Sequence, residues 1–305
     1  MAPVDFTGVF PIVITPFDAD ENPDLESFDR IVRFMRKLGV DGVTILGVLG
    51  ESNRLLDAER EALIRTAIAA AGDLPVVVGT SHAGTRATCD LSRLAEQLGA
   101  AGVMVTPARE PVPNPDKIFE YFQRVAEAIA IPIVAQDHPA STQVHMALPL
   151  LIKLVREIPQ ITCIKQEAVP TPPKTRALRA GLKKSRVTIL TGLGALYGQY
   201  DLESGANGFM TGFAFPEVLQ ALVKARDAGQ QERVHNIYQR FLPLIVFEQQ
   251  PGVAIRKEIF RLRGLAHSNQ VRHPGSAIDP ETAAQLQAVL TATLPDIDIT
   301  QPISI

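Results

Sequence analysis

Short apolar, β-branched runs alternate with amphipathic helical stretches along most of the chain. Apolar residues that return every three or four positions predict helices over segments such as Leu25 to Gly39 and Glu232 to Glu248. Strands that are apolar along their length are typical of a parallel sheet that helices cover on both faces. Eight such runs are present: Gly8 to Thr15, Gly42 to Leu46, Pro75 to Thr80, Gly102 to Thr106, Pro132 to Gln136, Ile161 to Lys165, Val187 to Thr191 and Gly208 to Thr211.

This alternation predicts an α/β protein built as a (β/α)8 TIM barrel, because eight parallel strands with crossover helices close naturally into a ring. A doubly wound sheet is the alternative. It usually has fewer strands, and no G-x-G-x-x-G sequence follows the first strand here. We expect the barrel over residues 1–215, C-terminal helices packed on it over residues 216–295, and a tail over residues 296–305.

The composition favours a small-molecule partner. Lys and Arg total 30 against 33 Asp and Glu, a net charge of −3, so nothing indicates binding to nucleic acid or to an anionic membrane. No apolar run reaches the roughly 18 residues that span a bilayer. The opening segment has no basic region and carries Asp5, so it does not resemble a signal peptide. Cys89 and Cys163 lack the spacing of a disulfide framework, which fits a reducing cytoplasm.

Lys165 ends the sixth predicted strand, in the sequence ITCIKQEA. Active sites of such barrels form at the carboxyl ends of the strands, and alternation places Cys163, Lys165 and Glu167 on one face. If that face is the barrel interior, burial favours the neutral amine that can form a Schiff base. The alternative is a lysine that extends to the strand end and pairs with Glu167 or Asp137.

The sequence GVLGES, from Gly47 to Ser52, follows the second predicted strand and precedes a helix that begins near Asp57. Its glycines allow backbone amides to approach an anion such as a carboxylate closely. An ordinary strand-to-helix turn explains the same glycines equally well.

Taken in order, the segments resemble the dihydrodipicolinate synthase and N-acetylneuraminate lyase family, the class I aldolase barrels. GVFPIVITPFD is similar to the family's first strand, GVLGES to its G-T-T-G-E/S loop, GVMVTP to its fourth strand, CIKQEA to its I-K-E strand end and VAIRKEIFRLRGL to its C-terminal helix. The resemblance implies a Schiff base between Lys165 and a 2-oxo acid such as pyruvate, formed without a cofactor. It also implies a homotetramer, and a substrate carboxylate held by the backbone of Gly47, Val48 and Leu49.

The chain departs from this family at the groups that relay protons. The sequence AQDHP stands where the family has Y-N-x-P, which places Gln136 at the position of the tyrosine. Val48 and Leu49 replace the two threonines of the loop, and Ala108 replaces an aromatic residue after the fourth strand. The sequence PAST, over residues 139–142, lacks the arginine that synthases use for their second substrate. These departures disfavour dihydrodipicolinate synthesis.

The Q-D-x-P sequence, with an acid two residues after the lysine, resembles the branch of the family that dehydrates 2-keto-3-deoxy sugar acids such as 2-keto-3-deoxyarabonate. Glu167 is the candidate that removes the C3 proton or protonates the leaving hydroxyl, and apolar surroundings predict that its pKa is raised toward neutrality. Gln136 is expected to hydrogen-bond the substrate or a catalytic water. The alternative for Glu167 is a structural ion pair with Lys165, Arg256 or Lys257.

Five further residues are candidate substrate contacts. Ser52 is placed either to bind a sugar hydroxyl or to cap the following turn. His138 is either a proton shuttle or an ordinary loop histidine. The family resemblance implies that Gly192, Thr211 and Gly212 line the mouth that receives the distal part of the substrate. The histidines form no close ligand pair, so no metal site is expected.

Two classes of function remain at this stage. The first is a Schiff-base lyase, a dehydratase or an aldolase, with dihydrodipicolinate synthase proper as a variant of it. The second is a barrel that binds a 2-oxo acid but has lost its proton relay. The retained Lys165 favours an enzyme, because burying an amine costs stability.

Overall fold

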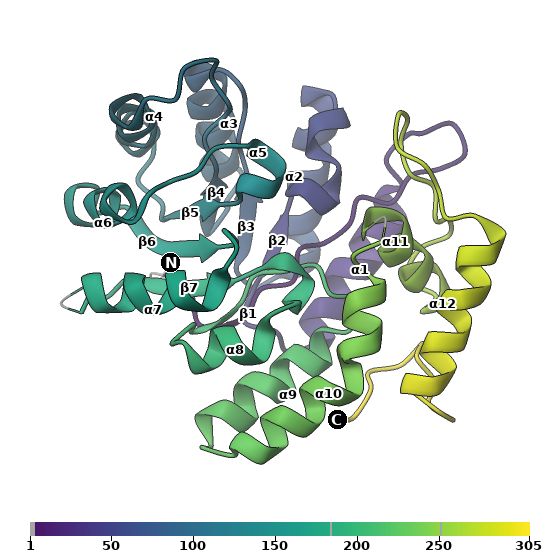
Figure 1. Ribbon diagram of the computed structural model, residues 1–305. Helices are drawn as coiled ribbons and strands as arrows, with labels where there is room; N and C mark the ends of the chain where they lie inside the picture. The colour runs from purple at the N-terminus through teal and green to yellow at the C-terminus, as the bar shows by residue number, and fades with distance from the viewer. Residues whose placement is uncertain (1–3, 184, 251) are drawn as a thin grey trace.

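The computed structural model is a barrel of parallel strands surrounded by helices (Figure 1). It describes residues 4–183, 185–250 and 252–305. The strands pair in the order β1-β8-β7-β6-β5-β4-β3-β2. A parallel bridge between Ile12 and Thr44 joins the two ends of this order, so the predicted (β/α)8 barrel is confirmed. The strands are β1 (Gly8–Val9), β2 (Val43–Ile45), β3 (Val76–Gly79), β4 (Gly102–Val105), β5 (Ile133–Asp137), β6 (Ile161–Gln166), β7 (Thr188–Thr191) and β8 (Gly208–Phe209).

The first strand is shorter than its predicted range of Gly8 to Thr15. Pro11 has no amide hydrogen, so the regular ladder cannot continue through it. The segment nevertheless stays beside β8, because the amide of Ile12 donates to Thr211 O at 2.8 Å. The carboxyl ends of β1 and β8 therefore still lead to the same place at the barrel mouth.

The helices cover the strands and continue into a C-terminal extension. They are α1 (Leu25–Leu38), α2 (Asp57–Ala71), α3 (Thr85–Gln97), α4 (Pro115–Ala128), α5 (Pro139–Thr142), α6 (Leu148–Glu157), α7 (Thr171–Gly181), α8 (Gly198–Glu203), α9 (Pro216–Asp227), α10 (Gln231–Phe247), α11 (Gly252–Leu262) and α12 (Pro280–Thr293). Three 3-10 turns accompany them: η1 (Val48–Gly50), η2 (Ser52–Arg54) and η3 (Leu193–Ala195). No helix in the described part of the chain is long and apolar enough to cross a membrane.

Local sequence explains where α1 begins and ends. The side chain of Asp24 accepts a hydrogen bond from Ser27 N at 2.9 Å, which caps the first turn. The helix ends at Gly39, whose φ of 66° is left-handed and costs glycine little. The predicted segment from Leu25 to Gly39 is therefore confirmed.

Two apolar cores hold the barrel together. The larger core lies between the strands and the helices. The smaller one fills the barrel interior and consists of Phe6, Phe10, Ile12, Val77, Met104, Val134, Cys163, Leu190 and Met210. Because the interior is packed with side chains, polar chemistry is confined to the strand ends above it.

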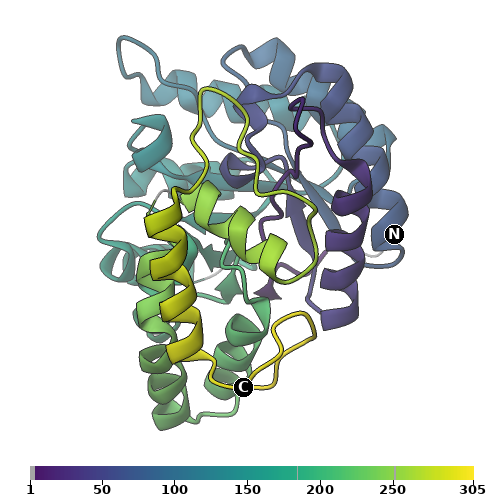
Figure 2. The same ribbon diagram turned by 90° about the vertical axis from the view of Figure 1, so that its right-hand side faces the viewer.

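The extension lies on one side of the barrel, where α11 lies next to α12 and at an angle to it (Figure 2). Helix α9 follows β8 and contacts β1 and β8, whereas α12 packs on α10 and α11. The division of the chain at residue 215 stays a prediction.

Candidate active site

Lys165 projects from β6 into the upper end of the barrel interior. Cys163, two residues earlier on the same strand, belongs to the interior core, so alternation turns Lys165 inward as well. Lys165 pairs in register with Gln136 on β5, which also faces inward. The lysine is only 4% exposed, so its side chain does not reach solvent at the strand end.

The carboxylate of Glu167 is the centre of the cluster around Lys165. Its Oε2 lies 3.1 Å from Lys165 Nζ and accepts a hydrogen bond from Gln136 Nε2 at 2.7 Å. Its Oε1 accepts a hydrogen bond from the backbone amide of Leu193 at 3.1 Å. The role of the Leu193 amide is not predictable from the sequence, because every residue except proline carries a backbone amide and residue type does not show which one faces the carboxylate. These three donors fix the carboxylate beside the amine.

The predicted rise in the pKa of Glu167 is wrong. Burial alone does raise the pKa of this carboxyl. The nearby charge of Lys165, together with the hydrogen bonds from Gln136 and Leu193, outweighs burial and holds the pKa of Glu167 below its ordinary value. The apolar neighbours of Glu167 are visible in the sequence, whereas the donors that meet its carboxylate come from β5 and from the loop after β7. Glu167 is therefore a carboxylate at neutral pH, ready to accept a proton.

The loop after β7 is shaped to fit Glu167. A Cβ added at Gly192 would lie 2.0 Å from Glu167 Oε1, so no side chain can stand there without moving the carboxylate. The following turn is held by Thr211, whose Oγ1 accepts a hydrogen bond from Gly194 N at 2.7 Å. Gly192 therefore makes room for the carboxylate, and Thr211 fixes the loop that carries the Leu193 amide.

The loop after β2 lies over the same interior. Leu49 packs against the interior core and above Gly212, where an added Cβ would lie 1.8 Å from Leu49 Cδ1. The amides of Gly50 and Glu51 bond back to Gly47 O and Val48 O, each at 3.0 Å. Among the described residues, the amides of Val48 and Leu49 donate to no protein acceptor. Two adjacent free donors at the mouth are suited to a carboxylate.

His138 lies at the edge of the cluster. Its Nδ1 is 3.9 Å from Glu167 Oε2 and 2.8 Å from Ser141 Oγ. Burial lowers the pKa of His138, so the imidazole is neutral at neutral pH. Asp137 lies on the outer face of β5, where it pairs with Lys174 Nζ at 2.6 Å.

Ser52 is not brought into this cluster. It lies in η2, where its carbonyl oxygen accepts a hydrogen bond from Arg60, and among the described residues no hydrogen bond joins it to Lys165 or Glu167. Of the three ion-pair partners considered for Glu167, Lys165 is the one that lies beside its carboxylate. Arg256 pairs with Glu248 at 2.8 Å instead, and Lys257 pairs with Glu51.

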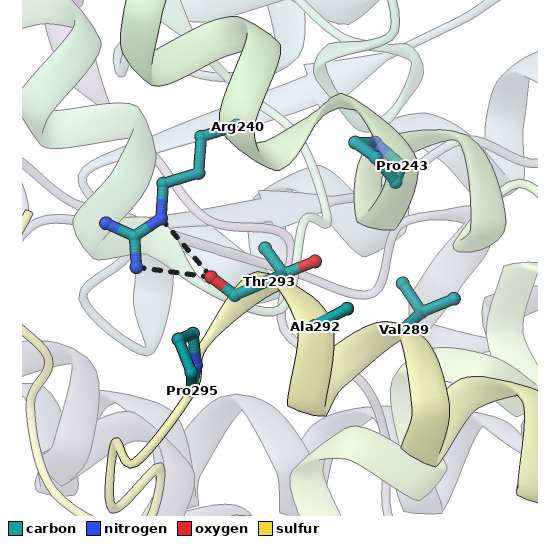
Figure 3. Close-up of a pocket in the computed structure, with 6 residues that line it drawn as sticks. All are labelled: Arg240, Pro243, Val289, Ala292, Thr293 and Pro295. Atoms are coloured by element: carbon teal, nitrogen blue, oxygen red, sulfur yellow. Dashed lines mark hydrogen bonds between the residues drawn. The ribbon is translucent and has the colours of Figure 1, made fainter.

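A pocket on the outside of the extension has no comparable chemistry. It lies between α10 and α12 and is lined by Arg240, Pro243, Val289, Ala292, Thr293 and Pro295 (Figure 3). The Arg240 guanidinium donates to Thr293 O at 3.1 and 3.2 Å, which occupies it in joining the two helices. Within the described parts of the chain, no cluster of three or more His, Cys, Asp or Glu side chains is placed to bind a metal ion. The candidate active site is therefore the barrel mouth around Lys165.

A (β/α)8 barrel with a buried lysine and a carboxylate at the end of its sixth strand belongs to the class of barrel enzymes that work at the carboxyl ends of their strands. The family described as "Dihydrodipicolinate synthetase family" matches residues 5–293. The chain belongs to this family, whose members are lyases.

Individual relatives agree with this assignment. The chain is 38% identical to L-2-keto-3-deoxyarabonate dehydratase of Azospirillum brasilense, over 92% of this chain and 93% of that protein. It superposes on the dihydrodipicolinate synthase of Rhodopseudomonas palustris with a TM-score of 0.90 and 35% identity, covering 96% and 99% of the two chains. A prophage protein of the same family from E. coli K12, solved in complex with pyruvate, superposes with a TM-score of 0.87 and 30% identity, covering 94% and 98%.

Proposed function

We propose that this protein is a Schiff-base dehydratase that removes water from a 2-keto-3-deoxy sugar acid. The observation that carries the proposal is the Glu167 carboxylate, 3.1 Å from Lys165 Nζ, in a barrel where Gln136 stands in the place of a phenol. Acid/base work then falls to Glu167. The 38% identity to a protein named L-2-keto-3-deoxyarabonate dehydratase supports this choice of reaction.

The first step is formation of the imine. Glu167 takes a proton from the Lys165 ammonium, and the free amine attacks the C2 carbonyl carbon of the substrate. The carbonyl oxygen leaves as water, with one proton from the amine and the proton that Glu167 returns. This gives a protonated imine and restores the Glu167 carboxylate. The free amides of Val48 and Leu49 hold the neighbouring carboxylate, and the glycine at position 47 lets them approach it.

The second step is elimination. Glu167 removes a proton from C3, and the electron pair of the broken C–H bond forms an enamine with the imine. The enamine electrons then expel the hydroxyl at C4, which leaves as water with the proton that Glu167 had accepted. Hydrolysis of the conjugated imine releases the 2-oxo product and restores Lys165, so the net change is the loss of one water molecule.

Residues around the barrel mouth are the proposed contacts of the substrate's distal hydroxyl groups. His138 lies beside Glu167 and is neutral at neutral pH, so it can donate or accept a hydrogen bond from the substrate. Gly192, Thr211 and Gly212, from the loops after β7 and β8, are proposed contacts, and Ser52 of η2 is a further one. Gln136 holds Glu167 through its amide and contacts the substrate or a catalytic water.

Borohydride trapping tests this proposal. The protein is incubated with pyruvate, with L- and D-2-keto-3-deoxyarabonate, and with pyruvate plus aspartate semialdehyde, and then reduced. Peptide mass spectrometry reads the modified residue, and chromatography reads the products. We expect an adduct on Lys165, none in Lys165→Ala, and an unchanged adduct in Lys153→Ala, which alters an exposed lysine of α6.

The products separate the alternatives. Loss of water from a deoxy sugar acid supports the dehydratase. Cleavage to pyruvate and an aldehyde would mean an aldolase, and a condensation product with aspartate semialdehyde would mean a synthase. If no 2-oxo acid formed an adduct, the remaining alternative would be a barrel that binds a 2-oxo acid without catalysis.

Two further features belong to this proposal. The family resemblance supports a homotetramer, which sedimentation analysis measures. Two free, buried cysteines, Cys89 and Cys163, fit the reducing conditions of the cytoplasm.

A further inference from the structure

Glu51 is the charged residue of the loop after β2, from Gly47 to Ser52, and the proposed function does not use it. It lies between the turns η1 and η2 with a φ of 51°, a left-handed conformation that is unusual for a residue with a side chain. Its side chain is 1% exposed. A buried carboxylate on a left-handed residue persists only when surrounding groups hold it.

Groups from the C-terminal extension hold the Glu51 carboxylate. Lys257 of α11 forms an ion pair with its Oε1. Oε2 accepts hydrogen bonds from Arg54 Nη1 at 2.6 Å and from the backbone amide of Arg272 at 3.1 Å. Two of these three donors come from residues that lie more than 200 positions further along the chain.

Lys257 is itself fixed at three points. It is 0% exposed, and besides Glu51 its Nζ donates to Gln270 O at 2.6 Å. The same Nζ lies 4.2 Å from the ring centre of Phe17, and the guanidinium of Arg272 lies 4.4 Å from that ring. Phe17 is buried at 0% exposure. Because the Lys257 ammonium has these three partners, its position is fixed, and the Glu51 carboxylate must lie beside it to form the ion pair.

The direction of the loop amides depends on Glu51. Gly50 and Glu51 close η1 through their amides, and Thr15 Oγ1 donates to Gly50 O at 2.7 Å. If Glu51 lost its left-handed conformation, the turn would open and the amides of Val48 and Leu49 would change direction. Amide donors that are misplaced in this way would bind the substrate carboxylate more weakly.

We propose that Lys257 is a positioning residue, which through its ion pair with Glu51 holds the two free amides in place for the substrate carboxylate. This inference rests on the proposed function, because it assigns the amides to that carboxylate. It links the extension to the barrel mouth and identifies α11 as part of the machinery for binding a 2-oxo acid.

Trapping with borohydride over a range of pyruvate concentrations tests the inference. We expect Lys257→Met and Glu51→Gln to raise the half-saturating pyruvate concentration about tenfold or more, as expected when a buried ion pair that positions the binding amides is lost. The maximal fraction of Lys165 trapped should stay at the wild-type level. Lys257→Arg, which keeps the charge, should lie closer to the wild type than Lys257→Met does.

Lys153→Met is the matched control. Lys153 Nζ also lies 4.2 Å from a ring centre, that of Phe119, but it sits on α6 away from the loop. This variant should leave half-saturation unchanged. Amide hydrogen exchange across residues 47–51 should accelerate in Lys257→Met and not in Lys153→Met.

The outcomes separate the two proposals. If wild-type protein traps pyruvate and the Lys257 and Glu51 variants bind it as well as wild type does, the positioning role is overturned and the Schiff base stands. The role is also overturned if the variants lose maximal trapping and half-saturation is unchanged, since that pattern means general damage. If the wild type traps no 2-oxo acid, the proposed function fails and this inference fails with it. Should Lys257→Met not fold, Glu51→Gln and Lys257→Arg decide the question.

Discussion

The Nζ of Lys165 lies 3.1 Å from Oε2 of Glu167, and both residues are only 4% exposed. An amine and a carboxylate in contact, without bulk water between them, can exchange a proton directly. In the proposed mechanism this pair supplies the nucleophile and its acid/base partner, two residues apart at one strand end.

Replacing Glu167 by Gln should separate imine formation from the later steps. The amide keeps the shape of the side chain but cannot accept a proton, so dehydration should fall by about 100- to 10,000-fold. Trapping of pyruvate on Lys165 should become slower but still reach completion, because water can take the lysine proton in place of Glu167. Steady-state rates and trapped mass measure the two effects, with Glu157→Gln, on the exposed face of α6, as the control. Equal loss of both would mean that Glu167 serves only to position the lysine.

Replacing Gln136 by Leu should move the acid limb of the activity profile. The hydrogen bond from Gln136 helps to hold the pKa of Glu167 below its ordinary value, so its removal raises that pKa. During acidification, Glu167 of the variant is then protonated at a higher pH than Glu167 of the wild type. A profile of kcat/KM against pH should show the acid limb shifted to higher pH in the variant. An unshifted limb would assign that limb to another group.

Replacing Gly192 by Ala should displace the Glu167 carboxylate. The new Cβ would lie 2.0 Å from Glu167 Oε1, which is far inside van der Waals contact. We expect loss of activity of at least about 100-fold, since a shift of about 1 Å at a catalytic group has that effect. Gly84→Ala is the control, because its Cβ would meet nothing closer than 3.9 Å. Comparable activity in both variants would show that the site tolerates the movement.

Replacing Glu59 by Gln should make the free energy of unfolding less sensitive to a fall in pH. Its carboxylate accepts hydrogen bonds from Arg272 at 2.6 and 2.7 Å, and these hold the pKa of Glu59 below its ordinary value. A lowered pKa in the folded state stabilises the protein above the unfolded value of 4.5, and this contribution is lost as the pH falls through the folded value.

The wild type should therefore exceed Glu59→Gln by about 1 kcal/mol in free energy of unfolding at pH 7, with the gap closing in acid. Urea denaturation at pH 7 and pH 4 measures both values. A gap that widened toward low pH would contradict this account of Glu59.

Much of the fold was predictable from local pattern. Each apolar run led to a strand, and α1 and α2 begin within a residue of their predicted starts, because periodicity and caps act over a few neighbouring residues. The first strand was predicted too long, since an apolar pattern does not register the missing amide of Pro11. Alternation along β6 also predicted that Lys165 and Glu167 share one face.

The electrostatics of the site were not predictable in the same way. The apolar neighbours of Glu167 in sequence indicated a raised pKa, whereas the donors that lower it come from β5 and from the loop after β7. Likewise, nothing near Glu51 in sequence indicates Lys257. Such contacts form only when distant segments meet.

The sequence by itself therefore determined the barrel and the lysine at the end of its sixth strand, because these follow from residue type and short-range spacing. The resemblance to the family placed Gln136 at the position of its tyrosine. The tertiary structure decided the charge state of Glu167, the free amides of Val48 and Leu49, and the ion pair between Glu51 and Lys257. The physical reason is that hydrogen bonds and charge pairs act through space over a few ångströms, and only the closed barrel brings their partners within that range.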